Sequence, residues 1–141
     1  MLLLAALPAL GCAKFQTARE CGSFVEAISQ WRGQGASAAP SSSAAPSAAP
    51  RAAPPPDSRA LAERYDDLAK RIDALKLTSP ELVPRAVRYQ KLAREAAGAL
   101  RDVAAAVEKG DAEKARRRRV EFDDIARGEA PLVADINAVC R

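Results

Sequence analysis

The sequence predicts an all-α protein, an antiparallel four-helix bundle with up-down-up-down topology. Ala, Leu, Arg and Glu dominate the 141 residues, and aromatic residues make up only 4%, a composition that favours helices over sheets. Apolar residues recur at spacings of three and four over long stretches. Short turns separate the last three stretches, as expected for antiparallel neighbours, whereas a long segment rich in Ala, Pro and Ser follows the first.

The first helix is expected over residues 17–32. Thr17 and Glu20 have the spacing of a capping box, in which each side chain accepts from the backbone N–H of the other residue. The residues that follow form one apolar face, at helical spacing: Cys21, Phe24, Val25, Ile28 and Trp31. We expect this face, including the single tryptophan, to pack in the core or at its edge.

Residues 33–57 have a different composition. Irregular Ser/Arg-Ala-Ala-Pro repeats and a further Pro-Pro pair place six of the ten prolines here. Proline removes backbone donors and the segment has little to bury, so we expect a disordered linker with stretches of polyproline II. A role as a spacer or as a polyproline ligand is the alternative.

Residues 58–141 are predicted to form the three-helix part of the bundle. The second helix, over residues 58–76, has the apolar seam Leu61, Tyr65, Leu68, Ile72 and Leu75. Ser79 is expected to be the N-cap of the third helix, with Pro80 in its first position. The seam of that helix is Leu82, Ala86, Tyr89, Ala93, Ala96, Leu100, Val103 and Val107.

A sharp turn and a fourth helix complete the predicted bundle. Lys109-Gly110-Asp111 supplies a C-terminal glycine and a new N-cap, so the fourth helix is expected from Ala112. Gly128 and Pro131 should kink it or divide it into two helices. Its predicted inward residues are Ala115, Phe122, Ile125, Ala126, Leu132, Val133, Ile136, Val139 and Cys140.

The chain has three cysteines, Cys12, Cys21 and Cys140, and no histidine. In the predicted topology the start of the first helix lies beside the end of the fourth, where Cys21 and Cys140 are placed. A disulfide requires α-carbons about 4.4–6.8 Å apart, so we predict that these two cysteines pair. An odd cysteine then remains to be explained. The alternative is that Cys21 and Cys140 are free thiols in a cytosolic protein.

Residues 1–12 are an apolar run that ends in Gly11-Cys12. The run resembles the lipobox of bacterial lipoproteins, although Ala9 and Leu10 stand in swapped order. The resemblance implies that Cys12 takes a diacylglyceryl group and becomes the mature N-terminus. Residues 1–11 would then be a signal peptide and residues 12–16 a lipid tether.

Secretory signals begin with a basic segment, yet no Lys or Arg precedes Lys14. We therefore expect the true start to lie upstream. The alternative is that these residues begin a buried helix, which Pro8 and Gly11 disfavour.

Two further motifs are similar to those of uncharacterised alanine-rich bacterial lipoproteins. The first is Cys21, Phe24, Val25 and Ile28 on the first helix, and the second is Ile136-Asn137-Ala-Val-Cys140. The resemblance implies a lipid anchor on the periplasmic side of the cell envelope and an unidentified envelope protein as partner. Ala13, in place of the Asp that retains some lipoproteins at the inner membrane, favours the outer membrane. The resemblance implies no enzymatic activity.

One charge cluster suggests a different function, a binding module for an anionic ligand. It consists of Arg116, Arg117, Arg118 and Arg119. Such runs can contact phospholipid headgroups, cell-wall polymers or, in a cytosolic protein, nucleic acid. Acidic residues four positions away are available to Arg117 and Arg119 but not to Arg116 or Arg118. Four consecutive residues also spread around most of a helix and cannot form one face, so we expect nucleic acid as a partner only if Cys12 is not lipidated.

Catalytic chemistry is not expected from this sequence. Asp66-Asp67 and Asp123-Asp124 are adjacent pairs, whose side chains diverge by about 100° on a helix and cannot form a dyad. The chain lacks histidine, a nucleophile elbow and a phosphate-binding loop. Tyr65 and Tyr89 occupy seam positions and are expected in the core. We therefore expect a non-enzymatic protein without cofactor or metal.

Overall fold

The computed structural model describes residues 10–36 and 57–141, with side chains described for residues 14–33 and 57–141. The described residues form five helices: α1 (Leu10–Ala36), α2 (Ser58–Ala74), α3 (Val83–Glu108), α4 (Ala112–Arg127) and α5 (Glu129–Val139). The predicted all-α fold is confirmed. α4 and α5 follow one another directly and together take the place of the predicted fourth helix; we refer to them as the α4–α5 rod. Most of the predicted signal peptide and linker, residues 1–9 and 37–56, lies outside the described residues.

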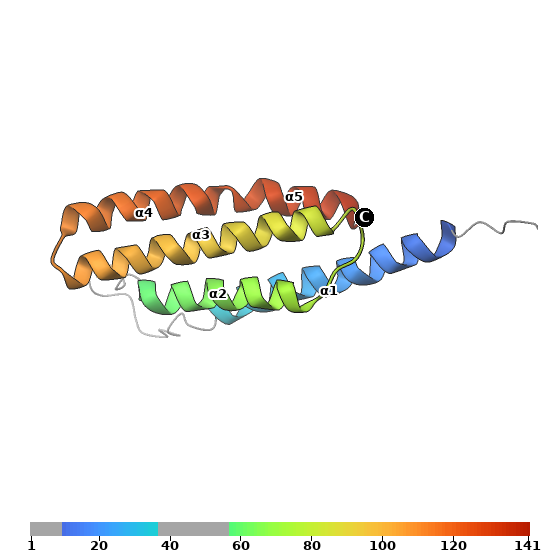
Figure 1. Cartoon of the computed structure of the whole chain (residues 1–141), viewed down its shortest axis with the longest axis horizontal. Helices are drawn as coiled ribbons and strands as arrows, with labels where there is room; N and C mark the ends of the chain where they lie inside the picture. The colour runs from blue at the N-terminus through green and yellow to red at the C-terminus, as the bar shows by residue number, and fades with distance from the viewer. Residues whose placement is uncertain (1–9, 37–56) are drawn as a thin grey trace, which may run out of the picture.

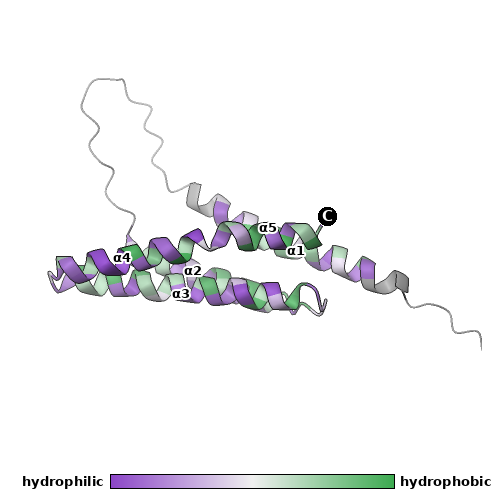
Figure 2. Cartoon of the chain, turned by 90° about the horizontal axis from the view of Figure 1, so that it is seen from above, coloured by the Kyte–Doolittle hydropathy of each residue, from purple (hydrophilic) through white to green (hydrophobic). Residues whose placement is uncertain are grey.

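α1, α2, α3 and the α4–α5 rod alternate in direction, and α3 is the central helix (Figure 1). α3 packs against α2 on one side and against α4 and α5 on the other. α1 packs on α2, and the Cys21–Cys140 disulfide and the Arg32–Glu129 ion pair connect it to residues at the two ends of α5. The first turns of α1 project beyond the end of the bundle at which the C-terminus lies (Figure 1 and Figure 2).

α1 is longer at both ends than predicted. It begins at Leu10, so the expected tether over residues 12–16 is helical, and it continues to Ala36, into the expected linker. Ala13, Lys14 and Gln16 are good helix formers, and Gly11 does not prevent the backbone from entering the helix. Because the helix starts earlier, the N–H groups of Thr17 and Glu20 bond within it, and the predicted capping box is wrong.

α2 begins and the α3–α4 turn forms as predicted. Asp57 caps α2 through a hydrogen bond from the Arg59 N–H to Oδ1 at 2.9 Å. α2 ends at Ala74 because Lys76 adopts a left-handed conformation with φ 48°. Gly110 has φ 70° in the turn before α4, and Asp111 caps α4 by accepting from the Lys114 N–H at 2.9 Å.

The predicted break in the fourth helix is two helices that meet at Gly128. A Cβ at Gly128 would lie 3.1 Å from the Ile125 carbonyl oxygen, so glycine relieves a tight backbone contact at the junction of α4 and α5. Pro131 is in the first turn of α5, where a missing N–H leaves no helical hydrogen bond unmade.

The core confirms most of the predicted seams, with two corrections. Side chains from all the helices are buried together, including Phe24, Leu68 and Leu100 at 0% exposure. Val25 is 39% exposed and Val107 63% exposed. Val25 is outside because α1 contacts the bundle along the narrow stripe Cys21, Phe24, Ile28 and Trp31, and at the end of α3 the buried position is Ala106.

Candidate functional site

Cys21 and Cys140 close the bundle at one end. Cys21 is buried on α1, and Cys140 follows the last turn of α5. A disulfide joins them, with α-carbons 5.5 Å apart and a sequence separation of 119. This is the pairing that the up-down-up-down topology predicts.

Beside the disulfide, Glu20 binds the loop between α2 and α3. The Thr78 N–H donates to its two carboxylate oxygens at 3.2 and 3.1 Å, the Thr78 hydroxyl donates at 2.7 Å, and the Ser79 N–H donates at 2.9 Å. Gln16 Nε2 donates to the same carboxylate at 3.2 Å. Partial burial opposes ionisation, but the hydrogen bonds from Ser79 and Thr78 outweigh it and lower the pKa of Glu20.

Ser79 has a different role from the predicted one. α3 begins at Val83, and the Ser79 carbonyl accepts from the N–H groups of Leu82 and Val83 at 3.1 and 3.0 Å. The Ser79 hydroxyl lies 3.1 Å from the Thr17 hydroxyl. Ser79 is therefore a turn residue that α1 holds, rather than the N-cap of α3.

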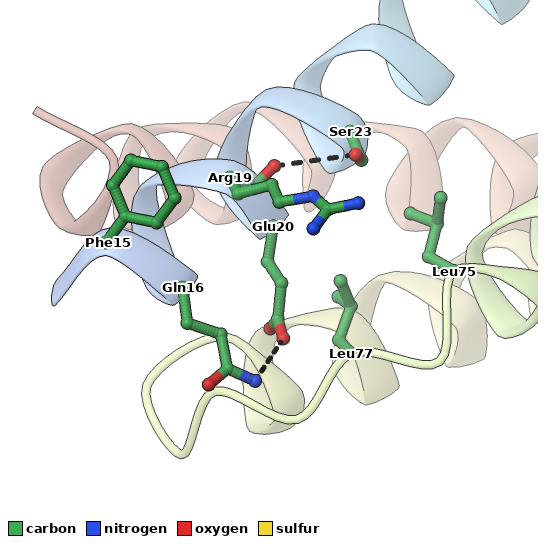
Figure 3. A pocket seen from close by; sticks show the side chains of 7 residues that line it. All are labelled: Phe15, Gln16, Arg19, Glu20, Ser23, Leu75 and Leu77. Atoms are coloured by element: carbon green, nitrogen blue, oxygen red, sulfur yellow. Dashed lines mark hydrogen bonds between the residues drawn. The ribbon is translucent and has the colours of Figure 1, made fainter. Parts of the chain in front are cut away.

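Two hollows flank the first turns of α1 at this end. One is lined by Phe15, Gln16, Arg19, Glu20, Ser23, Leu75 and Leu77 (Figure 3). The other adjoins the disulfide and is lined by residues that include Lys14, Thr17, Glu81 and Arg141. Sequence reasoning missed both hollows because they form between α1 and a loop distant in sequence.

Cys12 lies on α1, nine residues before Cys21 (21 − 12). Its side chain is outside the described ones, so lipidation of Cys12 remains a prediction. The backbone runs as one helix from Cys12 to the disulfide.

A second polar cluster fixes the other half of α1. Tyr89 is 1% exposed, and its hydroxyl donates to Glu129 Oε1 at 2.5 Å. Arg32 Nη2 donates to the same oxygen at 2.8 Å. Burial, and then the hydrogen bond to Glu129, raise the pKa of Tyr89. The predicted core position of Tyr89 is confirmed, but no sequence signal indicated that Glu129 would connect α1, α3 and α5.

Trp31 packs at the edge of the core, as expected. Its indole Nε1–H donates to the Arg64 carbonyl at 3.0 Å, and Arg64 Nη2 donates to the Trp31 carbonyl at 3.1 Å. The indole ring lies 4.9 Å from the Tyr65 ring, between centroids. Trp31 therefore stabilises the packing of α1 on α2 through these two hydrogen bonds and the ring contact.

The arginine run on α4 is largely paired with carboxylates. Arg117 pairs with Glu113 at 2.7 Å and Arg119 with Asp123 at 3.5 Å, as their spacing suggested. Arg118, for which no i±4 partner was available, pairs with Glu121 at 2.6 Å and with Asp102 on α3 at 3.4 Å.

Arg116 is exposed and is the member of the run without an ion pair among the described residues. The run is therefore not a single free cationic face, which reduces the support for an anion-binding module.

The adjacent aspartates do not form dyads. Asp66 pairs with Arg101, Asp67 with Arg71 at 2.6 Å, Asp123 with Arg119 and Asp124 with Arg127. Within the described part of the chain, no group of three or more His, Cys, Asp or Glu residues is placed to hold a metal ion. None of the described helices is long and apolar enough to cross a membrane.

No protein-family model, curated protein or solved structure matches the chain.

Proposed function

We propose that the chain is a non-enzymatic lipoprotein of the bacterial cell envelope, anchored through lipid on Cys12. Its disulfide-closed helical bundle would serve a structural role or bind another envelope protein on the periplasmic side. The outer membrane is the favoured site, since Ala13 follows the anchored cysteine.

The observation that carries the proposal is the Cys21–Cys140 disulfide. Disulfides persist in exported proteins and are rare in the cytosol. The pairing uses two of the three cysteines, and the remaining one is the cysteine of the lipobox-like segment. The cysteine usage and the N-terminal pattern thus support the same compartment.

The course of α1 gives additional support. The same helix that contains Cys12 carries Cys21 into the disulfide and Glu20 onto the α2–α3 loop. A lipid on Cys12 would thus be connected to the bundle through about two and a half helical turns, and the bundle would be held near the membrane surface.

The test is the intact mass of the native protein, isolated from its own cells, before and after reduction. We expect a chain that starts at an acylated Cys12 and gains about two mass units on reduction, as one disulfide accepts two hydrogens. An unacylated chain with free thiols would refute the proposal. A confirmed anchor would direct the search for the partner to cross-linking in the envelope.

The alternative, an anionic-ligand module at Arg116–Arg119, has weaker support because three of the four arginines have carboxylate partners. It requires salt-dependent binding to anionic vesicles or cell-wall polymer that weakens in the double variant Arg116→Gln, Arg118→Gln. Unchanged affinity in that variant would remove it.

A further inference from the structure

We infer that the projecting end of α1 is a membrane-contact surface, in which the Phe15 ring enters the lipid–water boundary of a bilayer that contains anionic lipid. Lys14 and Arg19 would contact the headgroups. The inference rests on the proposed function, because it takes position 12 to be the point of anchoring.

The first support is the exposure and location of Phe15. Its side chain is 77% exposed, more than any other large hydrophobic residue among those described. It belongs to the second turn of α1, which begins at Leu10, and the first turns of this helix project past the bundle (Figure 1 and Figure 2). Figure 3 shows its ring at one side of the hollow, with Arg19 and Glu20 between it and Leu75 and Leu77. The described part of the chain therefore leaves this ring uncovered.

The second support is the register of α1. At about 100° per residue, positions 12, 15 and 19 lie within about 60° of one another on one helix stripe. Position 21 lies on the opposite side, where Cys21 reaches Cys140. The stripe that contains the anchoring position and Phe15 thus faces away from the disulfide and borders the open hollow that Leu75 and Leu77 line on its other side.

The third support is distance along the helix. Position 15 is the third residue after position 12, which corresponds to a rise of about 4.5 Å along the helix axis. Helices at membrane interfaces bury their apolar side chains about 5–10 Å into the headgroup region. A lipid attached at position 12 therefore brings the Phe15 ring within reach of the boundary.

The charges around Phe15 are suited to an anionic surface. Lys14 and Arg19 are exposed, and neither joins an ion pair within the described residues. Arg19 shares the stripe of Phe15, whereas Lys14, the residue before Phe15, lies on the disulfide side of the projecting end of α1. The carboxylate of Glu20, the residue after Arg19, accepts hydrogen bonds from the N–H groups of Thr78 and Ser79. Basic residues close to a membrane are attracted to its anionic lipids.

The rest of the outward stripe limits the contact to the end of the helix. Beyond Arg19 the stripe continues with Ser23, Glu26 and Gln30, all polar and exposed. We therefore expect the bundle to stand on the end of α1 rather than to lie along it.

The experiment uses the chain from Cys12 onward, the mature form under the proposed function, which keeps every residue of the described core. The Cys12 thiol is coupled, through a long flexible polyethylene glycol spacer, to a maleimide lipid in vesicles that contain phosphatidylglycerol. The spacer allows residue 15 to reach the bilayer without forcing it there. Helix content and an intact Cys21–Cys140 disulfide verify folding.

The readout is the quenching of an added tryptophan by lipids brominated on their acyl chains. Phe15→Trp is the test variant. Ser23→Trp on the same stripe and Val107→Trp, at an exposed position near the far end of α3, are the matched controls. Trp31 stays in every variant, because it is 7% exposed and supplies a constant background.

We expect the added emission of Phe15→Trp to fall by roughly half, as for a ring at interfacial depth, and the two controls to be unaffected. The loss should shrink when Lys14 and Arg19 are both replaced by Gln, or when phosphatidylcholine replaces the anionic lipid. Equal quenching of Phe15→Trp and Val107→Trp by the brominated lipids would overturn the inference. Quenching of Phe15→Trp that stays the same without anionic lipid and without both basic residues would also overturn it. Coupling through maleimide needs no acylation by the cell. The vesicle experiment therefore tests the Phe15 contact alone, and the intact-mass experiment tests lipidation of Cys12 alone.

Discussion

Glu20 fastens α1 to the loop between α2 and α3, since its carboxylate accepts from two backbone N–H groups and one hydroxyl of that loop. Hydrogen bonds to the ionised form lower its pKa below the usual 4.5. A carboxyl group with a lowered pKa in the folded state stabilises the fold above its unfolded pKa, and this contribution is lost as the pH falls through the folded pKa.

Replacement of Glu20 by Gln should therefore reduce the free energy of unfolding at pH 7 by about 1 kcal/mol, the scale of a partly exposed charge-assisted contact. The difference between wild type and variant should diminish below about pH 4 as the wild-type carboxyl is protonated. Denaturant titrations at neutral and acid pH measure both effects. Glu26→Gln is the control, because among the described residues the Glu26 carboxylate accepts a hydrogen bond from Gln30 on its own helix and from no other element. Equal losses in the two variants would contradict this role of Glu20.

Tyr89 makes a buried polar contact at the centre of the bundle. Tyr89→Phe removes the donor to Glu129 and should cost about 1–2 kcal/mol of unfolding free energy. Tyr65→Phe is the matched control, because Tyr65 is equally part of the core but its hydroxyl makes no hydrogen bond among the described residues. Thermal or denaturant unfolding of the two variants measures the difference, and a similar loss in both would show that the Glu129 contact adds nothing.

At the scale of the helix, α3 is packed closely because its buried positions are mainly small. Ala93, Ala96 and Ala97 are all fully buried at 0% exposure, which allows α2 and the α4–α5 rod to approach from both sides.

An enlarged side chain at such a position should overpack the contact. We expect Ala96→Leu to lower the free energy of unfolding by about 1–3 kcal/mol. Ala105→Leu, at an exposed position of the same helix, has the same change in volume and propensity and should be near neutral. Denaturant unfolding of both variants tests this, and an unaffected Ala96→Leu variant would show that the helices separate easily.

The helices could be predicted well where apolar periodicity and local caps agree. This holds for the start of α2 at Ser58, for the Gly110 turn with Asp111, and for the break at Gly128. The Asp57 cap of α2 was not predicted. The ends of α1 could not be predicted, because Thr17 and Glu20 have the spacing of a cap while their side chains bond a loop about 60 residues away. Local spacing alone cannot distinguish these two uses of the same side chains.

The candidate site was predictable only where topology decides proximity. Cys21 and Cys140 follow from the helix order alone. The Glu20 contact with Thr78, the Glu129 link and the surroundings of Phe15 depend on the rotation and reach of α1, which the periodicity does not determine. Arg118 shows the same limit, since its partner Asp102 is on another helix.

At the scale of the whole molecule, the disulfide connects the first helix to the last residues of the chain across 119 positions. Closing a loop of this length restricts the unfolded chain and should contribute about 4–5 kcal/mol in the chain-entropy treatment.

Cys140→Ser should therefore lower the midpoint of denaturant unfolding strongly, while most of the helix content under native conditions is retained in α2 to α5. Circular dichroism and denaturant titration, with wild type measured in oxidised and reduced form, provide the test. The reduced wild type should match the variant. An unchanged midpoint in Cys140→Ser would show that the disulfide does not hold the bundle together.

The same bond changes what a protease can do to this protein. Residues 21 and 140 are covalently joined, so a single cut anywhere between them, including within residues 37–56, opens the loop without releasing a fragment. Every residue from 12 to 141 would stay attached to whatever holds Cys12. A nicked molecule would run as two pieces only after reduction. Shedding of the bundle would require two cuts between residues 21 and 140, one cut between residues 12 and 21, or one cut combined with loss of the disulfide.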